Sequence, residues 1–296
     1  MTYSNKKIII TGATGLIGKE IILPLKGLGF DIYCLTIDKN NPDIEGVTWI
    51  NANLFDKNEL KEAFNKVKPE YLINFAWATT DDYLTSNINF DFVIAGLELL
   101  KIFRENGGKR AIYAGTCFEY EFSDTPLKEN DTPISPKTTY AHCKNHLHQL
   151  AELYCQNNNI SFGWGRIFYV YGKNEHEKRL TGSIIKSLNN NEEVIIKSGK
   201  LKKDYMYTKD IAGAFAHFAN SQVEGSVNIC TGEAISIAEY ASAIGKKMGK
   251  ENLIKFMDEP NNQPPIIVGD NSRLIKKVEY TPKYKLEQAL DEILTK

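Results

Sequence analysis

A glycine-rich turn near the N-terminus is the feature that most constrains the fold of this 296-residue chain. An apolar run at residues 6–10 predicts a buried strand, and a helical pattern follows at residues 16–28. The turn between them has the spacing G-x-x-G-x-x-G, which lets the backbone turn tightly and approach a pyrophosphate, while the helix start offers free N–H groups. Such a triad also occurs in ordinary turns, but its place at the first strand-to-helix junction predicts a dinucleotide site. The residues of that predicted site are Gly12, Thr14, Gly15, Leu16, Ile17 and Gly18.

Strand-like and helical stretches alternate through the first half of the chain. Apolar runs typical of strands lie at residues 31–35, 47–50, 71–75, 110–114 and 160–167, and helical patterns lie at 57–67, 92–104 and 141–156. Pro24 is expected to kink the first helix, because it cannot donate a backbone hydrogen bond. This alternation predicts an α/β fold, a Rossmann doubly wound parallel sheet with helices on both faces.

The alternation loosens after about residue 168, where turn-prone segments become frequent. We therefore expect a Rossmann domain for NAD(P) over residues 1–168, with a later strand and helix near 203–219 returning to it. Residues 169–296 are expected to form mainly a smaller mixed α/β lobe that binds substrate. Ligands of such sheets lie beyond the carboxyl ends of the strands.

Composition and charge restrict the partners and the location. The chain is 42% hydrophobic and 25% charged, with a net charge of −1 and no Lys/Arg run, which gives little support to nucleic acid or membrane surfaces as partners. The N-terminal apolar run is too short for a signal peptide and no stretch is long enough to span a bilayer, so we expect a cytoplasmic protein. Five scattered cysteines form no C-x-x-C pair. His142, His146 and His148 lie close together, but only the first two are four residues apart and no carboxylate lies among the three, so no metal site is expected.

Two further features carry chemistry. Tyr140 directly precedes the helix predicted at residues 141–156, and Lys144 lies four residues later. This spacing places both side chains on one helical face. Such a pair is common by chance, but a nearby ammonium favours the phenolate and lets a tyrosine exchange a proton near neutral pH. Thr116 comes just after the strand predicted at 110–114, where its hydroxyl either holds a substrate oxygen beside Tyr140 or satisfies backbone groups.

Together with three later segments, these features resemble the extended short-chain dehydrogenase/reductases, in their NAD-dependent epimerase/dehydratase branch of nucleotide-sugar modifying enzymes. Residues 166–172 (RIFYVYG) resemble the R-x-x-x-x-Y-G segment of that branch. Residues 203–211 (KDYMYTKDI) are similar to its R-D-F-x-x-V-x-D-x segment, and residues 227–233 (VNICTGE) to its V-x-N-I-G-x-G-E turn. The resemblance runs through nearly the whole chain, with the matches in the family's order.

The resemblance implies roles for individual residues. Tyr140 is the expected acid/base, Lys144 is expected to lower its pKa and to hold the nicotinamide ribose, and Thr116 is expected to align the substrate. The other implied cofactor contacts are Asn53 and Leu54 at the adenine, Ala76 in the groove, and Phe168 and Tyr169 near the nicotinamide. The implied substrate contacts are Trp77, Thr116, Cys117, Phe118 and Tyr169, with Arg179 and Lys203 at a diphosphate.

Some of these contacts have a simpler interpretation. Trp77 either covers the sugar or nicotinamide or packs in the core, and Cys117 is either a proton donor or, more simply, a small buried apolar residue. Lys203 stands where the family has an arginine, and a lysine cannot grip a phosphate with two parallel hydrogen bonds.

The chain also departs from the resembled branch. Its dehydratases have Asp-Glu after the Ser/Thr, where this chain has Cys117 and Phe118, so those positions have no carboxyl group for water elimination. Val93 replaces the asparagine of an N-x-x-G helix entry that ends at Gly96. Thr36 stands where NAD-preferring relatives carry an acid, and Lys39 could neutralise a 2′-phosphate, so we expect NADPH to be preferred. NAD is the alternative, because Asp38 could equally move in to serve it.

We therefore expect an NAD(P)H-dependent ketoreductase that reduces a nucleotide-linked 4-keto (deoxy)sugar to the hydroxy sugar. The alternative is a nucleotide-sugar epimerase with retained NAD, and a third interpretation is a non-catalytic NADP-sensing protein, which would have no need of an activated phenol. The family habit implies a homodimer packed through the helices predicted at 92–104 and 141–156.

Overall fold

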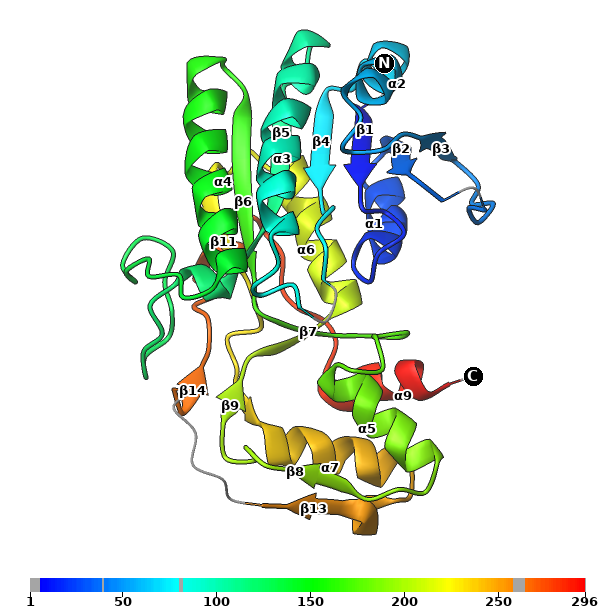
Figure 1. Cartoon of the computed structure of the whole chain (residues 1–296), viewed down its shortest axis with the longest axis vertical. Coiled ribbons are helices and arrows are strands. Elements are labelled where there is room, and N and C mark those ends of the chain that lie inside the picture. Colours follow the sequence, from blue (N-terminus) through cyan, green and yellow to red (C-terminus); the bar gives the residue numbers. More distant parts are fainter. Residues whose placement is uncertain (1–5, 39, 80–81, 258–263, 296) are drawn as a thin grey trace.

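A parallel sheet organises the computed structural model, which describes residues 6–38, 40–79, 82–257 and 264–295. In these residues seven strands run in the order β11-β6-β5-β4-β1-β2-β3, and each neighbouring pair is parallel. Chain order 3-2-1-4-5-6 is that of the doubly wound dinucleotide-binding fold, so the predicted fold class is confirmed (Figure 1). The strands are β1 Lys6–Thr11, β2 Phe30–Thr36, β3 Val47–Asn51, β4 Tyr71–Asn74, β5 Arg110–Thr116, β6 Ser161–Ile167 and β11 Gly225–Ile229.

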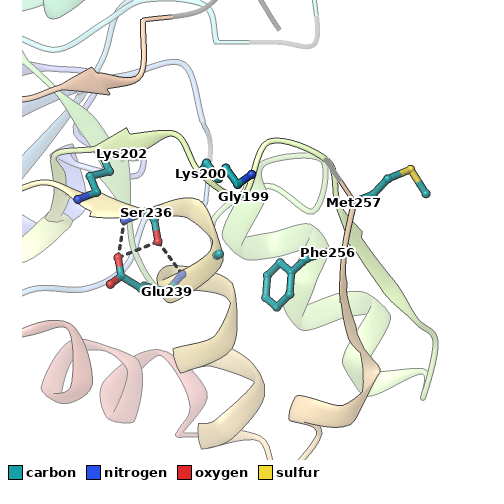
Figure 2. Close-up of a pocket in the computed structure, with 8 residues that line it drawn as sticks. Gly199, Lys200, Lys202, Ser236, Glu239, Phe256 and Met257 are labelled. Carbon is teal, nitrogen blue, oxygen red and sulfur yellow. Dashed lines mark hydrogen bonds between the residues drawn. The ribbon is translucent and has the colours of Figure 1, made fainter. Parts of the chain in front are cut away.

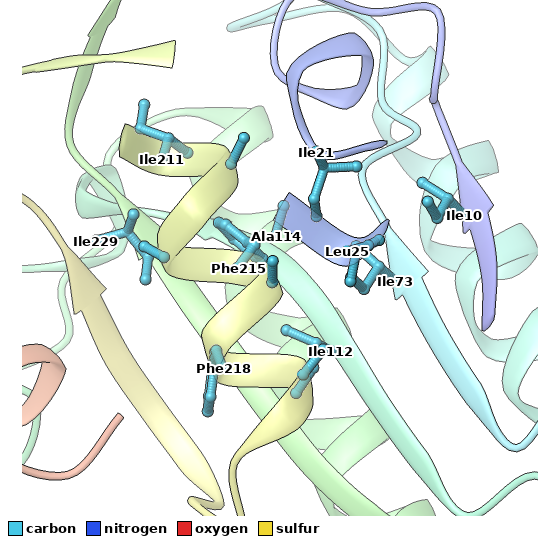
Figure 3. Packing of buried hydrophobic residues seen from close by; sticks show 14 of the residues in the cluster. Ile10, Ile21, Leu25, Ile73, Ile112, Ala114, Ile211, Phe215, Phe218 and Ile229 are labelled. Carbon is cyan, nitrogen blue, oxygen red and sulfur yellow. The ribbon is translucent and has the colours of Figure 1, made fainter. Parts of the chain in front are cut away.

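Helices cover both faces of this sheet. On one face, α2 (Lys57–Val67), α3 (Ile88–Glu105) and α4 (Thr139–Asn157) bury one apolar cluster. On the other face, α1 (Ile22–Gly27) and α6 (Thr208–Asn220) bury a second cluster, with Phe215 and Phe218 of α6 facing Ile112 of β5 (Figure 3). β1 alternates between the two clusters, with Ile8 and Ile10 in one and Ile9 in the other, which is why its sequence is apolar without interruption.

The helix predicted at residues 16–28 is interrupted. A 3₁₀ turn, η1 (Gly18–Glu20), comes first, and α1 begins only at Ile22. A continuous helix would need the nitrogen of Pro24 to donate to the carbonyl of residue 20, which proline cannot do. Pro24 instead lies in the first turn of α1, where a missing N–H group has no intrahelical partner to lose.

A smaller set of elements forms the second lobe (Figure 1). Its core lies between α5 (Leu180–Asn189), α7 (Ile237–Lys247) and α9 (Leu286–Leu294), with Ile184, Ile244 and Leu290 buried. Short strand pairs complete it: β7 (Tyr169–Tyr171) with β10 (Tyr205–Tyr207), β8 (Val194–Ile196) with β13 (Ile254–Phe256), and β9 (Lys202–Lys203) between β12 (Ile235–Ser236) and β14 (Ile266–Ile267). The chain returns to the large sheet through α6 and β11, and a domain boundary at residue 168 stays a prediction.

Short elements complete the description: the 3₁₀ turns η2 (Cys117–Glu119) and η3 (Glu251–Leu253), and the helix α8 (Ser272–Lys276). All five cysteines are buried and free. Among the helices of the described ranges, none combines the length and the apolar character needed to cross a bilayer.

Candidate active site

The glycine turn lies against the end of β4. Gly12 has φ +69°, and a Cβ at this position would come within 2.8 Å of the backbone nitrogen of Ala76. A Cβ on Gly18 would come within 2.1 Å of the carbonyl oxygen of Gly12. The Ala76 N–H donates to Thr11 Oγ1 at 3.3 Å, which fixes the loop after β4 to the end of β1. The turn therefore requires its glycines and brings Ala76 beside them, at the carboxyl ends of β1 and β4.

Thr116 and Tyr140 meet at the carboxyl end of β5. Thr116 is the last residue of β5 and caps η2, accepting a hydrogen bond from the Phe118 N–H. Tyr140 lies in the first turn of α4, which begins after the Thr138 cap. The side-chain hydroxyl of Thr116 acts on the Tyr140 phenol and lowers its pKa, so two residues predicted to act together lie close to each other.

Lys144 lies one turn after Tyr140 on α4 and is directed elsewhere. Its Nζ donates to the carbonyl oxygen of Ala114 at 2.8 Å and lies 3.7 Å from the ring centroid of Trp77. The same Nζ is 6.0 Å from the ring centroid of Tyr140. Burial lowers the pKa of Lys144 to about 7, and the charge of Glu119 opposes this shift.

The expected lowering of the Tyr140 pKa is not found. Burial, followed by the neighbouring Tyr83, raises the pKa of Tyr140 above its usual value of 10.0, and only the hydrogen bond with Thr116 acts against this. Lys144 is not among the groups that shift this pKa, and its Nζ is directed to the carbonyl oxygen of Ala114. The phenol of Tyr140 thus keeps its proton at neutral pH in this arrangement.

A buried ionic cluster lies behind Thr116. The Glu119 carboxylate accepts hydrogen bonds from the Thr116 N–H at 2.9 Å, from Trp164 Nε1 at 2.9 Å and from Arg166 Nε at 2.8 Å. Arg166 also donates to Tyr120 Oη at 3.0 Å. The cluster holds the backbone of the Thr116 turn. Sequence reasoning missed Glu119, although Thr-x-x-Glu is the spacing of a capping box, which the structure contains.

Several aromatic side chains and a lysine lie in the neighbourhood of Tyr140 and Thr116. Tyr83, which sequence reasoning also missed and which no local pattern marks, packs edge-on against Tyr140 with ring centroids 5.0 Å apart. Phe118 contacts Tyr169 in the same way at 6.1 Å, and Lys203 Nζ lies 5.2 Å from the Tyr169 ring centroid. Of the remaining predicted substrate contacts, Cys117 is buried, and Arg179 lies near enough to Tyr83 for its charge to oppose the rise that burial causes in the pKa of Tyr83.

These surroundings change two pKa values. Burial lowers the pKa of Lys203 to about 8. Burial raises the pKa of the Cys117 thiol, so this residue is a protonated, largely apolar side chain at neutral pH. The simpler of the two interpretations of Cys117 is the one its packing favours.

The outer predicted cofactor contacts lie farther along the sheet. Thr36 ends β2, and its Oγ1 accepts a hydrogen bond from the Asp38 N–H at 3.0 Å. Lys39 lies outside the described residues. Asn53 accepts from the Phe55 N–H, and Leu54 packs against the apolar cluster under α2 and α3. Phe168 is buried with Cys117. Their roles at a cofactor stay predictions.

Two of the three histidines on α4 pair with each other. The rings of His142 and His146 stack with centroids 6.0 Å apart, and His146 Nδ1 is 2.7 Å from the carbonyl oxygen of His142. Within the described part of the chain, no group of three His, Cys, Asp or Glu side chains is arranged to hold a metal ion.

A separate hollow of about 580 Å³ lies in the second lobe, between the start of α7 and the end of β13 (Figure 2). Its walls include Lys202, Phe256 and the Ser236–Glu239 capping box drawn in Figure 2. The first N–H groups of α7 are already bonded within the chain, to the carbonyl oxygens of Leu201 and Gly199. Lys202 is exposed here, whereas its neighbour Lys203 is buried beside Tyr169.

Several named proteins are similar to this chain in sequence or in fold. It is 24% identical over 250 residues to the dTDP-6-deoxy-L-talose 4-dehydrogenase (NAD(+)) of Aggregatibacter actinomycetemcomitans, covering 83% of this chain and 91% of the relative. It is 26% identical over 314 residues to the dTDP-4-dehydro-6-deoxyglucose reductase of Escherichia coli, covering 97% and 96%. The UDP-glucose 4-epimerase of Thermus thermophilus, crystallised as a complex with NAD, shares the fold with a TM-score of 0.84, 22% identity, and 97% and 98% coverage.

A family-wide comparison covers most of the chain. The model of the NAD dependent epimerase/dehydratase family matches residues 8–230, from β1 through the Thr116, Tyr140 and Lys144 positions to the end of β11. The strand order and the glycine turn at the end of β1 agree with this match. The chain belongs to the NAD-dependent epimerase/dehydratase family.

Proposed function

We propose that this protein reduces a nucleotide-linked 4-keto (deoxy)sugar to the corresponding hydroxy sugar, with NAD(P)H as the hydride source. The observation that carries the proposal is the placement of Tyr140, at the start of α4, beside Thr116 at the carboxyl end of β5, with Lys144 one turn away. Reduction of a ketone needs a proton on the new alkoxide, and a phenol aligned by a neighbouring hydroxyl group can supply it. The names of the two curated relatives, a 4-dehydrogenase and a 4-dehydro sugar reductase, support the same chemistry.

The glycine turn fits a dinucleotide. Gly12 and Gly18 leave bare backbone where a Cβ has no room, so a pyrophosphate can approach the N–H groups of residues 14–18 closely. The bound nicotinamide supplies the hydride. Tyr140 supplies the proton, Thr116 aligns the carbonyl oxygen of the substrate, and Lys144 holds the nicotinamide ribose.

The protonation state of Tyr140 suits the proton transfer that a reduction needs. Burial raises the pKa of Tyr140, so the phenol carries its proton at neutral pH and is in the form that protonates an alkoxide. Oxidation of an alcohol would need the phenolate, which this environment disfavours.

Elimination of water is disfavoured by the residues after Thr116. Cys117 and Phe118 carry no carboxyl group. The next acid in the sequence, Glu119, accepts hydrogen bonds from Arg166, Trp164 and the Thr116 backbone, so its carboxylate is already engaged by three donors. A dehydratase needs an acid that can remove and return protons at the sugar.

Two finer choices concern the ligands. Thr36 at the end of β2 offers no carboxylate to repel a 2′-phosphate, and this supports NADPH over NADH. The relatives named for NAD or crystallised with it make NADH the alternative, and comparable catalytic efficiency with the two cofactors would refute the preference. For the diphosphate of a nucleotide sugar we propose Arg179 and Lys203. Arg179 lies near Tyr83, where its charge opposes the rise in pKa caused by burial. Lys203 Nζ lies 5.2 Å from the ring centroid of Tyr169.

One isotope experiment separates reduction from epimerisation. NADPH deuterated at the transferable position is supplied with a 4-keto sugar nucleotide, and the product is examined by mass spectrometry. A reductase gives a sugar heavier by one deuterium with matching loss of NADPH absorbance. Conversion of substrate without cofactor oxidation and without label would instead establish an epimerase with retained NAD.

We further propose that two copies of the chain pack through α3 and α4. Ile94 on α3 is 67% exposed, and Leu153 on α4 is 55% exposed. Leu150 adds to the same pair of helices, which pack against each other and leave these apolar side chains on their outer side. Burying them against a second copy is favourable in proportion to the apolar area removed from water.

A further inference from the structure

The indole of Trp77 is held in one orientation. Trp77 follows β4, and its Nε1 donates to Asn89 Oδ1 at 2.8 Å. Its ring stacks on Phe92 of α3, with centroids 5.2 Å apart and planes 24° apart. It meets Tyr140 edge-on at 6.1 Å. A hydrogen bond and two ring contacts therefore fix the plane of the indole beside the predicted acid/base.

Asn89 is itself fixed. It is fully buried, and its Nδ2 donates to the carbonyl oxygens of Tyr83 and Ser86, both at 2.7 Å. Its Oδ1 is thereby turned toward Trp77. The residue lies in the first turn of α3, one turn before Val93, where the sequence lacks the asparagine of the resembled helix entry.

The face of the indole is occupied by Lys144. Lys144 Nζ lies 3.7 Å from the Trp77 ring centroid, well inside the distance of about 6 Å at which a cation is attracted to an aromatic face. On its other side the same Nζ donates to the carbonyl oxygen of Ala114 at 2.8 Å. The ammonium is thus held between a strand carbonyl and an indole.

We propose that Trp77, anchored by Asn89, is a positioning residue that holds Lys144 at the end of β5 within one helical turn of Tyr140. This role rests on the proposed function only in assigning the dinucleotide ribose to Lys144. It differs from the expectation that Trp77 covers the sugar or nicotinamide, which stays a prediction.

The groups that face Lys144 determine whether its pKa should rise or fall when Trp77 is replaced. Tyr140 lies on its own helix, Trp77 follows β4, and Glu119 in η2 is the carboxylate whose charge raises the pKa of Lys144. Burial has the larger effect and lowers that pKa to about 7. Replacing the indole by a smaller side chain admits water to the ammonium, so the pKa of Lys144 should rise.

The test measures the titration of Lys144 directly. Trace acetylation of the purified protein across a pH range, read by peptide mass spectrometry, reports the titration of each lysine. In Trp77→Leu we expect the midpoint for Lys144 to move up by about one pH unit or more. Trp77→Phe, which keeps an aromatic face, should stay close to the native protein. Trp49→Leu removes an indole that bonds Pro42 on the far edge of the sheet and should change nothing.

A second measurement covers the case in which Trp77→Leu fails to fold. The difference in fluorescence between the native protein and Trp77→Phe gives the emission of Trp77, which should change with pH at the Lys144 midpoint. In Lys144→Met that pH dependence should disappear. An unchanged Lys144 midpoint in folded Trp77→Leu, or a Trp77 emission that is indifferent to Lys144, would overturn the proposal.

Binding of NADPH and NADH separates this proposal from the proposed function. If Trp77 positions Lys144 for a ribose, Trp77→Leu should weaken dinucleotide binding about tenfold, the value of one cation–π contact. Unaltered dinucleotide affinity in that variant would overturn the positioning role. Failure of the native protein to bind either dinucleotide would refute the proposed function, and the acetylation result would still decide the contact between Trp77 and Lys144.

Discussion

Replacing Lys144 by methionine should stabilise the protein while removing its activity. Lys144 is 4% exposed, and its pKa falls from 10.5 to about 7 because of burial. The folded state therefore disfavours the ammonium that the unfolded chain carries at neutral pH. Methionine has a similar length and no charge, so it fills the same space without that penalty.

The expected size follows from the pKa difference. One pKa unit corresponds to about 1.4 kcal/mol, so the shift of Lys144 destabilises the folded state by about 4 to 5 kcal/mol at pH 6.5. Losing the hydrogen bond to the Ala114 carbonyl and the contact of the ammonium with the Trp77 ring returns about 1 to 2 kcal/mol. The net gain is about 3 kcal/mol in the free energy of unfolding, or about 5 °C in Tm for a chain of 296 residues.

The sign of the pH dependence distinguishes this cause from improved packing. Because the folded pKa lies below the unfolded one, the penalty is complete below pH 7 and vanishes as the pH rises toward 10.5. The advantage of Lys144→Met should therefore shrink by about 3 kcal/mol between pH 6.5 and pH 9.5.

Urea unfolding followed by circular dichroism at both pH values measures this advantage, with Lys66→Met at an exposed position of α2 as the control. A variant no more stable than the native protein at pH 6.5, or an advantage equal at the two pH values, would refute the reasoning. Dinucleotide binding and turnover should both be lost in Lys144→Met, because a residue kept at such a cost to stability is expected to serve function.

Three other substitutions test the remaining assignments. Tyr140→Phe keeps the ring and removes the proton, so turnover should fall by ~10²-fold or more while NADPH still binds; near-normal turnover would show that another group is the acid. Glu119→Gln leaves Arg166 buried without its counter-charge, and the free energy of unfolding should fall by about 3 kcal/mol or more; an unchanged urea midpoint would contradict the importance of this pair. Leu153→Glu places a charge on the exposed side of α4, and sedimentation should show a shift from dimer to monomer; a native protein that already sediments as a monomer would dispose of the proposed pairing.

Much of the large sheet could be predicted from short-range patterns. The helix at Lys57–Val67 has the predicted bounds, because its apolar residues recur at helical spacing and Asp56 caps its start. The uninterrupted apolar run of β1 indicated a strand covered on both faces. The helix after the glycine turn was predicted with the wrong continuity, since the place of Pro24 within a helical turn depends on where that turn begins.

The candidate site was likewise predictable only where it depends on local sequence. Spacing along α4 determined that Tyr140 and Lys144 share a helical face, and the end of β5 determined where Thr116 stands, because helical periodicity and strand ends are local properties of the chain. The Nζ of Lys144 lies against the ring of Trp77, which lies 67 residues away in sequence and follows another strand. Burial and cation–π contact depend on which distant segments the sheet brings together, and so does the hydrogen bond from Trp77 to Asn89. No pattern within one helix carries that information, and for this reason the pKa of Tyr140 moved up where its sequence neighbours alone predicted a fall.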